Sequence, residues 1–299
     1  MFNKIYKAFV VAGCNFYGWH KNLRIYLCFI FEFIMCYLLT DKSVKFAEEF
    51  GTIMQITEPF IWVFGDSNSI LLISVLLIFL FADMPQVNAS TPLFLMRTDR
   101  KTWLAGQFIY IICATIIFLL FILISTSLVC IKYAYIGNVW SPTAAILSYS
   151  NSEQTVAIPS MLKTLELSHP YKTTFYIFVL MLFYSLVLVF VMLYFNLRKG
   201  KAMSFVSVFA FSVYGFVLNP ETIKKLFHFS DDFMYKANVI VGWLSPLNQA
   251  TYQMHNFGYD KLPTIAETLL IFSALIIVLF VLSVFAIRKY NFNFTGTEG

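Results

Sequence analysis

Charged residues are scarce in this sequence. Asp, Glu, Lys and Arg make up 12% of its 299 residues, whereas a soluble domain carries about 25%. So few charges cannot cover a globular surface with polar groups, which excludes an ordinary soluble fold. Several apolar runs instead approach or exceed the roughly 17–25 residues that a helix needs to cross a bilayer. The sequence therefore predicts an all-α integral membrane protein, with residues 1–299 as one transmembrane domain.

Motifs of catalysis and of metal or nucleotide binding are missing as well. There is no H-E-x-x-H, no G-x-S-x-G and no C-x-x-C, and the four histidines are scattered. We expect no enzyme activity in this chain, no catalytic residue, no metal site and no nucleic-acid partner. The phosphate-binding pattern G-x-x-x-x-G-K-[ST] is also absent. No cofactor is therefore expected in this chain, and any ATP and Mg²⁺ would be bound by a partner ATPase.

The apolar runs predict six transmembrane helices. They cover roughly residues 23–40, 66–82, 104–131, 174–197, 202–218 and 265–287. The second is short in its purely apolar part, Ile70 to Ala82, so it can include some of residues 60–65. The fifth is short as well.

Lys and Arg are unevenly distributed over the segments between these runs. Twelve lie on one side of the predicted membrane, in about sixty residues: 1–24, 83–103, 198–201 and 288–299. Nine lie on the other side, in well over a hundred residues: 41–65, 132–173 and 219–264. Because cytoplasmic loops carry the excess of Lys and Arg, we expect a multi-pass protein of the plasma membrane with both termini in the cytoplasm.

Two segments outside the spans are apolar enough to enter the membrane. In residues 1–22, apolar side chains recur at helical spacing: Phe2, Ile5, Tyr6, Phe9 and Val10. This spacing predicts an amphipathic helix in the inner interface, with a frayed tail as the alternative. Residues 236–262 are interrupted by Gly242, Pro246 and Gly258. They predict short re-entrant or interfacial helices on the outer side, around Trp243, Ser245, Pro246 and Leu247.

A dense group of charges stands between two apolar runs. Four charged residues, which we call the charge cluster, fall within five positions: Arg97, Asp99, Arg100 and Lys101. Upstream, Thr91 and Pro92 can start a short helix that includes Leu93 and Phe94, and Thr98 or Asp99 can cap the third span. This segment is either a basic loop that only fixes the topology or a docking element for a cytoplasmic partner.

Glu32 lies in the middle of the first predicted span. An ionisable group at that depth costs at least a few kcal/mol and usually faces the protein interior. Four interpretations of Glu32 stay open: it pairs with a neighbouring helix, it is protonated, it lies along a transport path, or the span is misplaced.

Four features together make the chain resemble the membrane subunit of type-2 ABC exporters, the ABC-2-type permease class, and bacterial members above all. They are the interfacial helix 1–22, the cluster in RTDRKTWLAGQ between spans two and three, the inner hairpin RKGK at 198–201, and the outer stretch WLSPLNQATYQMH, which is similar to the family's S-P-L stretch. The resemblance covers nearly the whole chain at the level of topology. The outer segment 132–173 is longer than in a minimal member, and Glu32 is no hallmark of the class.

The resemblance implies that residues 86–97 form a coupling helix in a groove of a cytoplasmic ATPase. Thr91, Pro92, Leu93 and Phe94 would belong to that helix, and the charge cluster would face the ATPase or the lipid phosphates. It also implies two ATPase copies and a second permease chain, identical or sister, because six spans make half a transporter. The exported compound would be amphipathic, a peptide antibiotic or a lipid.

Two other function classes remain open. An intramembrane enzyme would need His, Asp or Glu clustered at one depth, whereas Glu32 stands alone. A non-catalytic membrane sensor or immunity protein would bind a toxin through its long outer loops and would need no ATPase. Dependence on an ATPase partner separates the transporter from both.

Overall fold

The structure, a computed structural model, describes residues 2–85, 91–149, 162–228, 230, 233–258 and 260–290. The helices in chain order are α1 (Phe2–Tyr17), α2 (Leu23–Glu49), α3 (Glu58–Val63), α4 (Ser67–Leu80), α5 (Thr91–Arg97), α6 (Arg100–Cys130), α7 (Pro142–Tyr149), α9 (Leu162–Leu167), α10 (Pro170–Lys199), α11 (Lys201–Val217), α12 (Pro220–Phe227), α13 (Met234–Leu244), α14 (Pro246–Ala250) and α15 (Ile265–Ala286). Short 3-10 turns cover Trp19–Lys21, Ile131–Tyr133 and Tyr252–Met254. The predicted all-α class is confirmed, apart from one pair of two-residue strands, β1 (Met54–Gln55) and β2 (Ala134–Tyr135).

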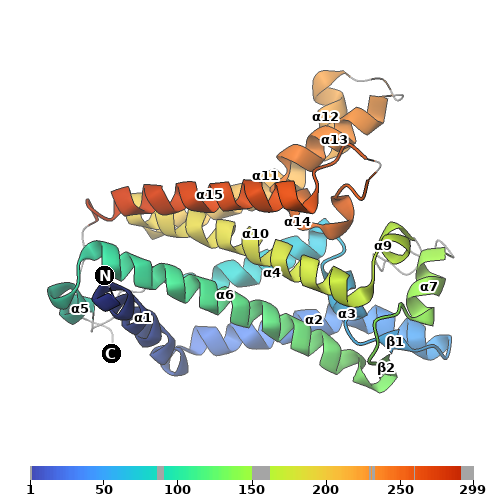
Figure 1. The fold of residues 1–299 in the computed structure, drawn as a ribbon, viewed down its shortest axis with the longest axis horizontal. Coiled ribbons are helices and arrows are strands. Elements are labelled where there is room, and N and C mark those ends of the chain that lie inside the picture. Colours follow the sequence, from blue (N-terminus) through green and yellow to red (C-terminus); the bar gives the residue numbers. More distant parts are fainter. Residues whose placement is uncertain are drawn as a thin grey trace.

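Long apolar helices form a bundle (Figure 1). Within the described residues, four are long and apolar enough to cross a membrane: α2, α6, α10 and α15. α11 and α12 together would make a fifth, with a bend of 78° between them. These helices indicate a multi-pass membrane protein, as the sequence predicts.

The second predicted span is divided in the structure. α4 has 14 residues, a length of about 21 Å against a hydrocarbon core of about 30 Å. The preceding apolar residues form the separate, buried helix α3. Asp66 ends the connection by accepting a bond from the backbone N–H of Ser69 at 2.8 Å, which caps α4. The number of six spans therefore stays a prediction.

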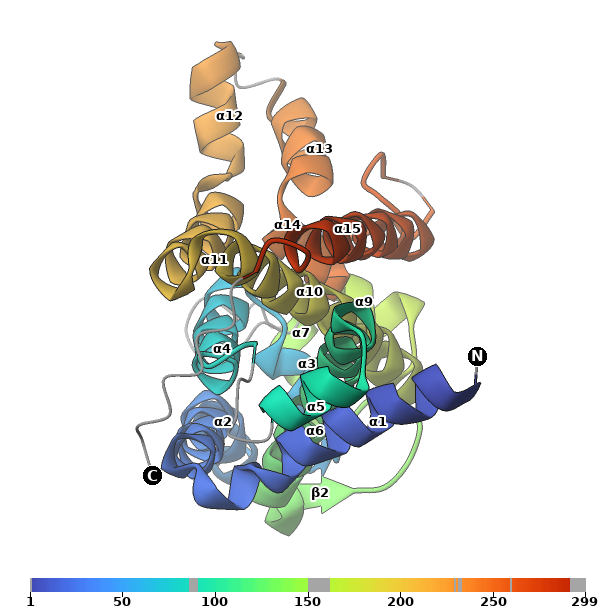
Figure 2. The same ribbon diagram turned by 90° about the vertical axis from the view of Figure 1, so that its left-hand side faces the viewer.

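α10 lies at the centre of the bundle, with α4, α6, α11 and α15 around it (Figure 2). Every residue from Tyr184 to Tyr194 is buried. A helix that is apolar on all sides is expected to sit in the middle of such a bundle. α15 is peripheral by contrast, and large apolar side chains such as Leu270 and Ile277 are exposed on it.

α1 lies across one end of the bundle and packs on the first turns of α6 (Figure 2). The contact is close because position 106 is glycine. A Cβ on Gly106 would lie 2.6 Å from the Cβ of Val11 and 2.8 Å from the carbonyl oxygen of Ala8. Further along, the Asn15 amide donates to Gln107 Oε1 at 3.0 Å and the Trp19 indole donates to the Tyr110 hydroxyl at 2.9 Å.

The connections sort to opposite ends of the bundle. α1, α5 and the turn between α10 and α11 lie at one end, which we call the α5 end (Figure 1). Gly200, with a φ of +90°, makes that turn. β1, β2, α3, α7 and α9 lie at the other, the α7 end. The parallel strand pair there joins Met54 to Ala134 and Gln55 to Tyr135. The α12–α13 hairpin projects sideways from the bundle and buries its own small core of Ile223, Ala237 and Val241.

Candidate functional site

The segment that carries the charge cluster forms α5 and the start of α6 at the α5 end. α5 begins at Thr91, which is buried, whereas residues 86–90 of the expected coupling helix lie outside the described residues, as do the side chains of Leu93 and Phe94. Pro92 is half-buried, and Met96, Arg97 and Lys101 are exposed. Met96 is 81% exposed, so the last turn of α5 presents a large apolar side chain next to the basic Arg97.

α1 holds part of the cluster in place. The Lys4 ammonium donates to Asp99 Oδ2 at 2.9 Å, and Lys7 donates to the carbonyl oxygen of Arg97 at 2.8 Å. The bond from Lys4 lowers the pKa of Asp99. Asp99 occupies the position before α6 expected for a cap, but its side chain makes no capping bond, because it is directed to Lys4 instead.

Arg100 joins the cluster to the last helix. Its Nη1 donates to the carbonyl oxygens of Ile287, Arg288 and Tyr290, at 3.3, 3.1 and 3.2 Å. These carbonyls follow the end of α15, where backbone acceptors lack partners within the helix and cations are favourable. Arg100 is therefore held by the end of α15 although it is exposed, and Met96, Arg97 and Lys101 are exposed beside it.

A groove of about 310 Å³ separates α1 from α5, and we call it the α1–α5 groove. Residues of both helices and of the connection to α6 line it: Lys4, Lys7, Leu95, Met96, Arg97, Thr98, Asp99 and Thr102. Three of these side chains are basic and one is acidic. The groove was not foreseen from the sequence, because the spacing of Lys4 and Lys7 does not show which helix faces them.

Glu32 is buried on the face of α2 that packs against α4 and α6. Neither of its carboxylate oxygens has a hydrogen-bond partner among the described residues. Other small or polar side chains continue the same buried stripe: Cys28, Cys36, Thr40 and Ser43. The bundle thus encloses a carboxyl group without giving it the partner that structural pairing would require.

The S-P-L stretch forms a tight junction between α11 and α14. Ser245 caps α14 by accepting from the backbone N–H of Asn248 at 3.3 Å, and its hydroxyl donates to the carbonyl oxygen of Gly215 at 2.7 Å. A Cβ on Gly215 would lie 3.0 Å from Leu247 Cβ, which explains the glycine there. Pro246 is buried too, while Trp243 is exposed and donates to the carbonyl oxygen of Lys261 at 3.1 Å.

Glu58, at the α7 end, is a buried acid that sequence reasoning missed. Its carboxylate accepts from the backbone N–H of Gln55 at 2.9 Å and from the backbone N–H and hydroxyl of Ser141 at 2.8 and 2.6 Å. Burial raises the pKa of Glu58 to about 7, although the bonds from Ser141 and Gln55 oppose the rise. In the sequence Glu58 looks like the polar start of an apolar run.

His255 is a second buried group that the sequence did not single out. Its Nδ1 lies 3.1 and 3.0 Å from the carbonyl oxygens of Thr251 and Tyr252, and its Nε2 lies 3.1 Å from the Thr268 hydroxyl. Two acceptors at Nδ1 place the ring proton there. Burial lowers the pKa of His255, so the neutral ring is the stable form.

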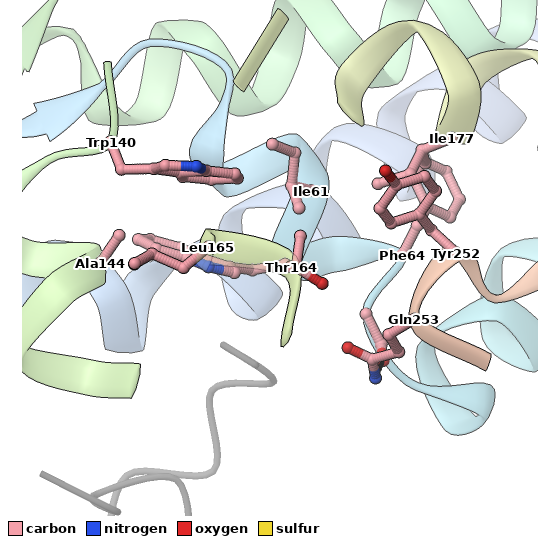
Figure 3. Close-up of a pocket in the computed structure, with 11 residues that line it drawn as sticks. Ile61, Phe64, Trp140, Ala144, Thr164, Leu165, Ile177, Tyr252 and Gln253 are labelled. Atoms are coloured by element: carbon pink, nitrogen blue, oxygen red, sulfur yellow. Dashed lines mark hydrogen bonds between the residues drawn. The ribbon is translucent and has the colours of Figure 1, made fainter. Parts of the chain in front are cut away.

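Aromatic side chains surround a small cavity at the α7 end (Figure 3). Trp62, Phe64, Trp140, Ile177 and Tyr252 line it, together with Gln253 and residues of α7 and α9. Its volume of about 20 Å³ is enough for one water molecule. The cavity is too small for an organic ligand in this conformation. Among the described residues no group of three His, Cys, Asp or Glu side chains could hold a metal ion.

No protein-family model, no curated protein and no solved structure matches this chain. The arrangement of its own residues is therefore what bears on function.

Proposed function

We propose that this chain is the permease subunit of an ATP-binding-cassette exporter of the ABC-2 type, driven by a separate cytoplasmic ATPase. The observation that carries the proposal is the outward face of the α5 end. There Met96 and Arg97 are exposed on the short helix α5, which leads through two residues into α6, and Lys101 is exposed in the first turn of α6. A force applied to α5 would thus reach a long, membrane-spanning helix directly.

The internal bonds of this end support a coupling role. Arg100 links the start of α6 to the end of α15, and Lys4 and Lys7 link α1 to the residues that precede α6. A displacement of α5 would therefore move three helices together. In the proposed assembly, six spans of this chain pair with a second permease chain, identical or sister, and two ATPase copies bind ATP and Mg²⁺. The S-P-L junction would be the re-entrant outer part of the path for an amphipathic compound.

The test is co-purification from the native host. The full chain is tagged, extracted in mild detergent, and analysed by mass spectrometry for chains with a nucleotide-binding loop. The docking variant combines Met96→Glu with Lys101→Glu, and it leaves Arg100 intact because Arg100 holds α15. Its matched control combines Ile136→Glu with Lys172→Glu, which replaces the same residue classes at the α7 end; Ile136 is 82% exposed.

We expect an ATPase to accompany the parent chain and the control, and its recovery to fall at least tenfold with the docking variant. Equal recovery with both variants would remove α5 from the contact. If the parent chain keeps its oligomeric state and brings down no ATPase, the exporter proposal is wrong.

The α7 end favours one second candidate, a sensor or immunity protein. Ile136 and Val139 are large apolar side chains, 82% and 69% exposed, on the connection between β2 and α7. Such residues suit a contact with a toxin outside the cell. The same co-purification separates the candidates, because a sensor needs no ATPase, and toxin protection lost on Ile136→Glu would support it.

A further inference from the structure

The α1–α5 groove carries an excess of positive charge. Lys4, Lys7 and Arg97 line it against the single acid Asp99. Lys4 is bonded to Asp99 at 2.9 Å, which balances one cation, so Lys7 and Arg97 leave two charges in excess. The bond from Lys7 to the Arg97 carbonyl oxygen keeps these two residues on neighbouring walls.

The start of α6 adds to this positive field. Thr98, Asp99 and Thr102 line the groove where the 31-residue helix begins. The positive end of the helix dipole lies there, and the Asp99 side chain is bonded to Lys4 rather than to the first turn. Backbone N–H groups at such a helix start favour an anion.

The side of α1 that faces away from the bundle is apolar. Ala8, Val11, Ala12 and Asn15 are buried against α6, whereas Tyr6, Phe9 and Tyr17 on the opposite side are 70%, 57% and 72% exposed. α1 therefore presents an aromatic and apolar surface next to a basic groove. Because α1 lies across the bundle end (Figure 2), the two surfaces meet where the headgroups of one leaflet would be.

We propose that the α1–α5 groove binds the anionic headgroup of a phospholipid, whose acyl chains lie along the exposed face of α1. The phosphate would be held by Lys7 and Arg97. The groove volume of about 310 Å³ provides space for a phosphate and a glycerol. The proposal rests on the membrane placement of the chain and does not require an ATPase partner.

The test measures lipid retention by the purified full chain. The protein is exchanged into detergent with equal amounts of phosphatidylglycerol and phosphatidylcholine of the same acyl chains, and bound lipids are counted by native mass spectrometry. The groove variant combines Lys7→Gln with Arg97→Gln. Its control combines Lys172→Gln with Lys225→Gln, two exposed lysines away from the α5 end.

We expect the parent chain and the control to retain phosphatidylglycerol preferentially, and the groove variant to lose that preference by on the order of tenfold, since each basic residue near an anionic surface contributes roughly 1 kcal/mol. A third variant, Tyr6→Ser with Phe9→Ser, should lower retention of both lipids without changing their ratio. Displacement by glycerol phosphate at millimolar concentration would show that the headgroup alone suffices, and would overturn the part assigned to the acyl chains.

An unchanged preference in the groove variant overturns the proposal. If that variant fails to fold, salt provides the second measurement on the parent chain. Raising the salt from 0.1 to 1 M shortens the Debye length from about 10 to about 3 Å, so the preference for phosphatidylglycerol must fall. A preference that is independent of salt would also contradict the proposal.

Discussion

Glu58 combines full burial with three hydrogen-bond donors at its carboxylate. Its pKa of about 7 in the folded chain compares with 4.5 for an unperturbed glutamate. Between these values the unfolded chain has released the proton and the folded chain keeps it. Stability is therefore fully present below pH 4.5 and is lost as the pH rises towards 7. We expect the contribution of Glu58 to the melting temperature in detergent to fall between pH 5 and pH 8, whereas that of His255, whose pKa burial lowers, rises with pH.

The variant Glu58→Gln isolates this contribution. Because a glutamine side chain stays neutral, the melting temperature of the variant should depend less on pH than that of the parent chain. The melting temperature of the variant should also be lower at pH 5, because the amide nitrogen that replaces one carboxyl oxygen cannot accept a bond from Ser141. His255 titrates in both proteins and cancels in the comparison. Identical pH dependence of the two melting temperatures would show that burial does not perturb Glu58.

Of the two buried acids, the burial of Glu32 could be predicted from the sequence, whereas the hydrogen-bond partners of Glu58 could not. Glu32 is conspicuous because a charge interrupts an apolar run, and its burial follows from the cost of exposing it to lipid. Glu58 stands beside a proline at the edge of an apolar run, where an acid is ordinary. Two of its three donors come from Ser141, more than eighty residues later in the chain, and no local pattern could have identified them.

The packing of α1 on α6 depends on one glycine. In Gly106→Ala, the new Cβ would lie within 3 Å of both Val11 and the backbone of Ala8, so α1 must move away from α6. Overpacking of this kind costs about 1–3 kcal/mol. We expect trypsin to cleave after Lys7 and Lys21 faster than in the parent chain, when the protein is held in detergent.

Gly13→Ala is the matched control for that change. Gly13 lies in α1, and a Cβ there would meet nothing within 4 Å. Alanine is favoured over glycine in a helix by up to about 1 kcal/mol, so cleavage should be unchanged or slower. If trypsin cleaved both variants faster to the same extent, the contact between Gly106 and α1 would not be the cause of the faster cleavage.

Hydropathy predicted where the long helices lie in the sequence. It did not predict which faces of two helices pack against each other. The long apolar runs correspond to α2, α6, α10, α11 and α15, with ends displaced by a few residues, except that α2 continues to Glu49. In α1 the sequence predicted an amphipathic helix from its large apolar residues, such as Tyr6 and Phe9. The face that packs on α6 is instead made of small ones, because close helix contacts favour small side chains. The bonds from Arg100 to the end of α15 could not be predicted from the sequence either, because α15 ends almost two hundred residues later.

In the whole molecule, the segments that connect the long helices lie at two opposite ends of the bundle, and the proposed function depends on which end faces the cytoplasm. The described segments expected in the cytoplasm, namely α1, α5, the turn at Gly200 and the residues after α15, gather at the α5 end (Figure 1). The excess of Lys and Arg in these segments favours the cytoplasmic side for that end. The ATPase contact requires this orientation, whereas the headgroup site requires only that the α5 end lie at a membrane surface.

Cysteine labelling in intact cells measures that orientation. We expect Ile136→Cys, at the α7 end, to react with a membrane-impermeant maleimide added outside, and Met96→Cys to react only after the membrane is permeabilised. The parent chain gives the background of its five native cysteines, three of which are buried. Labelling of Met96→Cys but not Ile136→Cys in intact cells would place α5 outside, where no cytoplasmic ATPase can reach it. Labelling of both would mean that the bundle does not carry its two ends to opposite sides of the membrane.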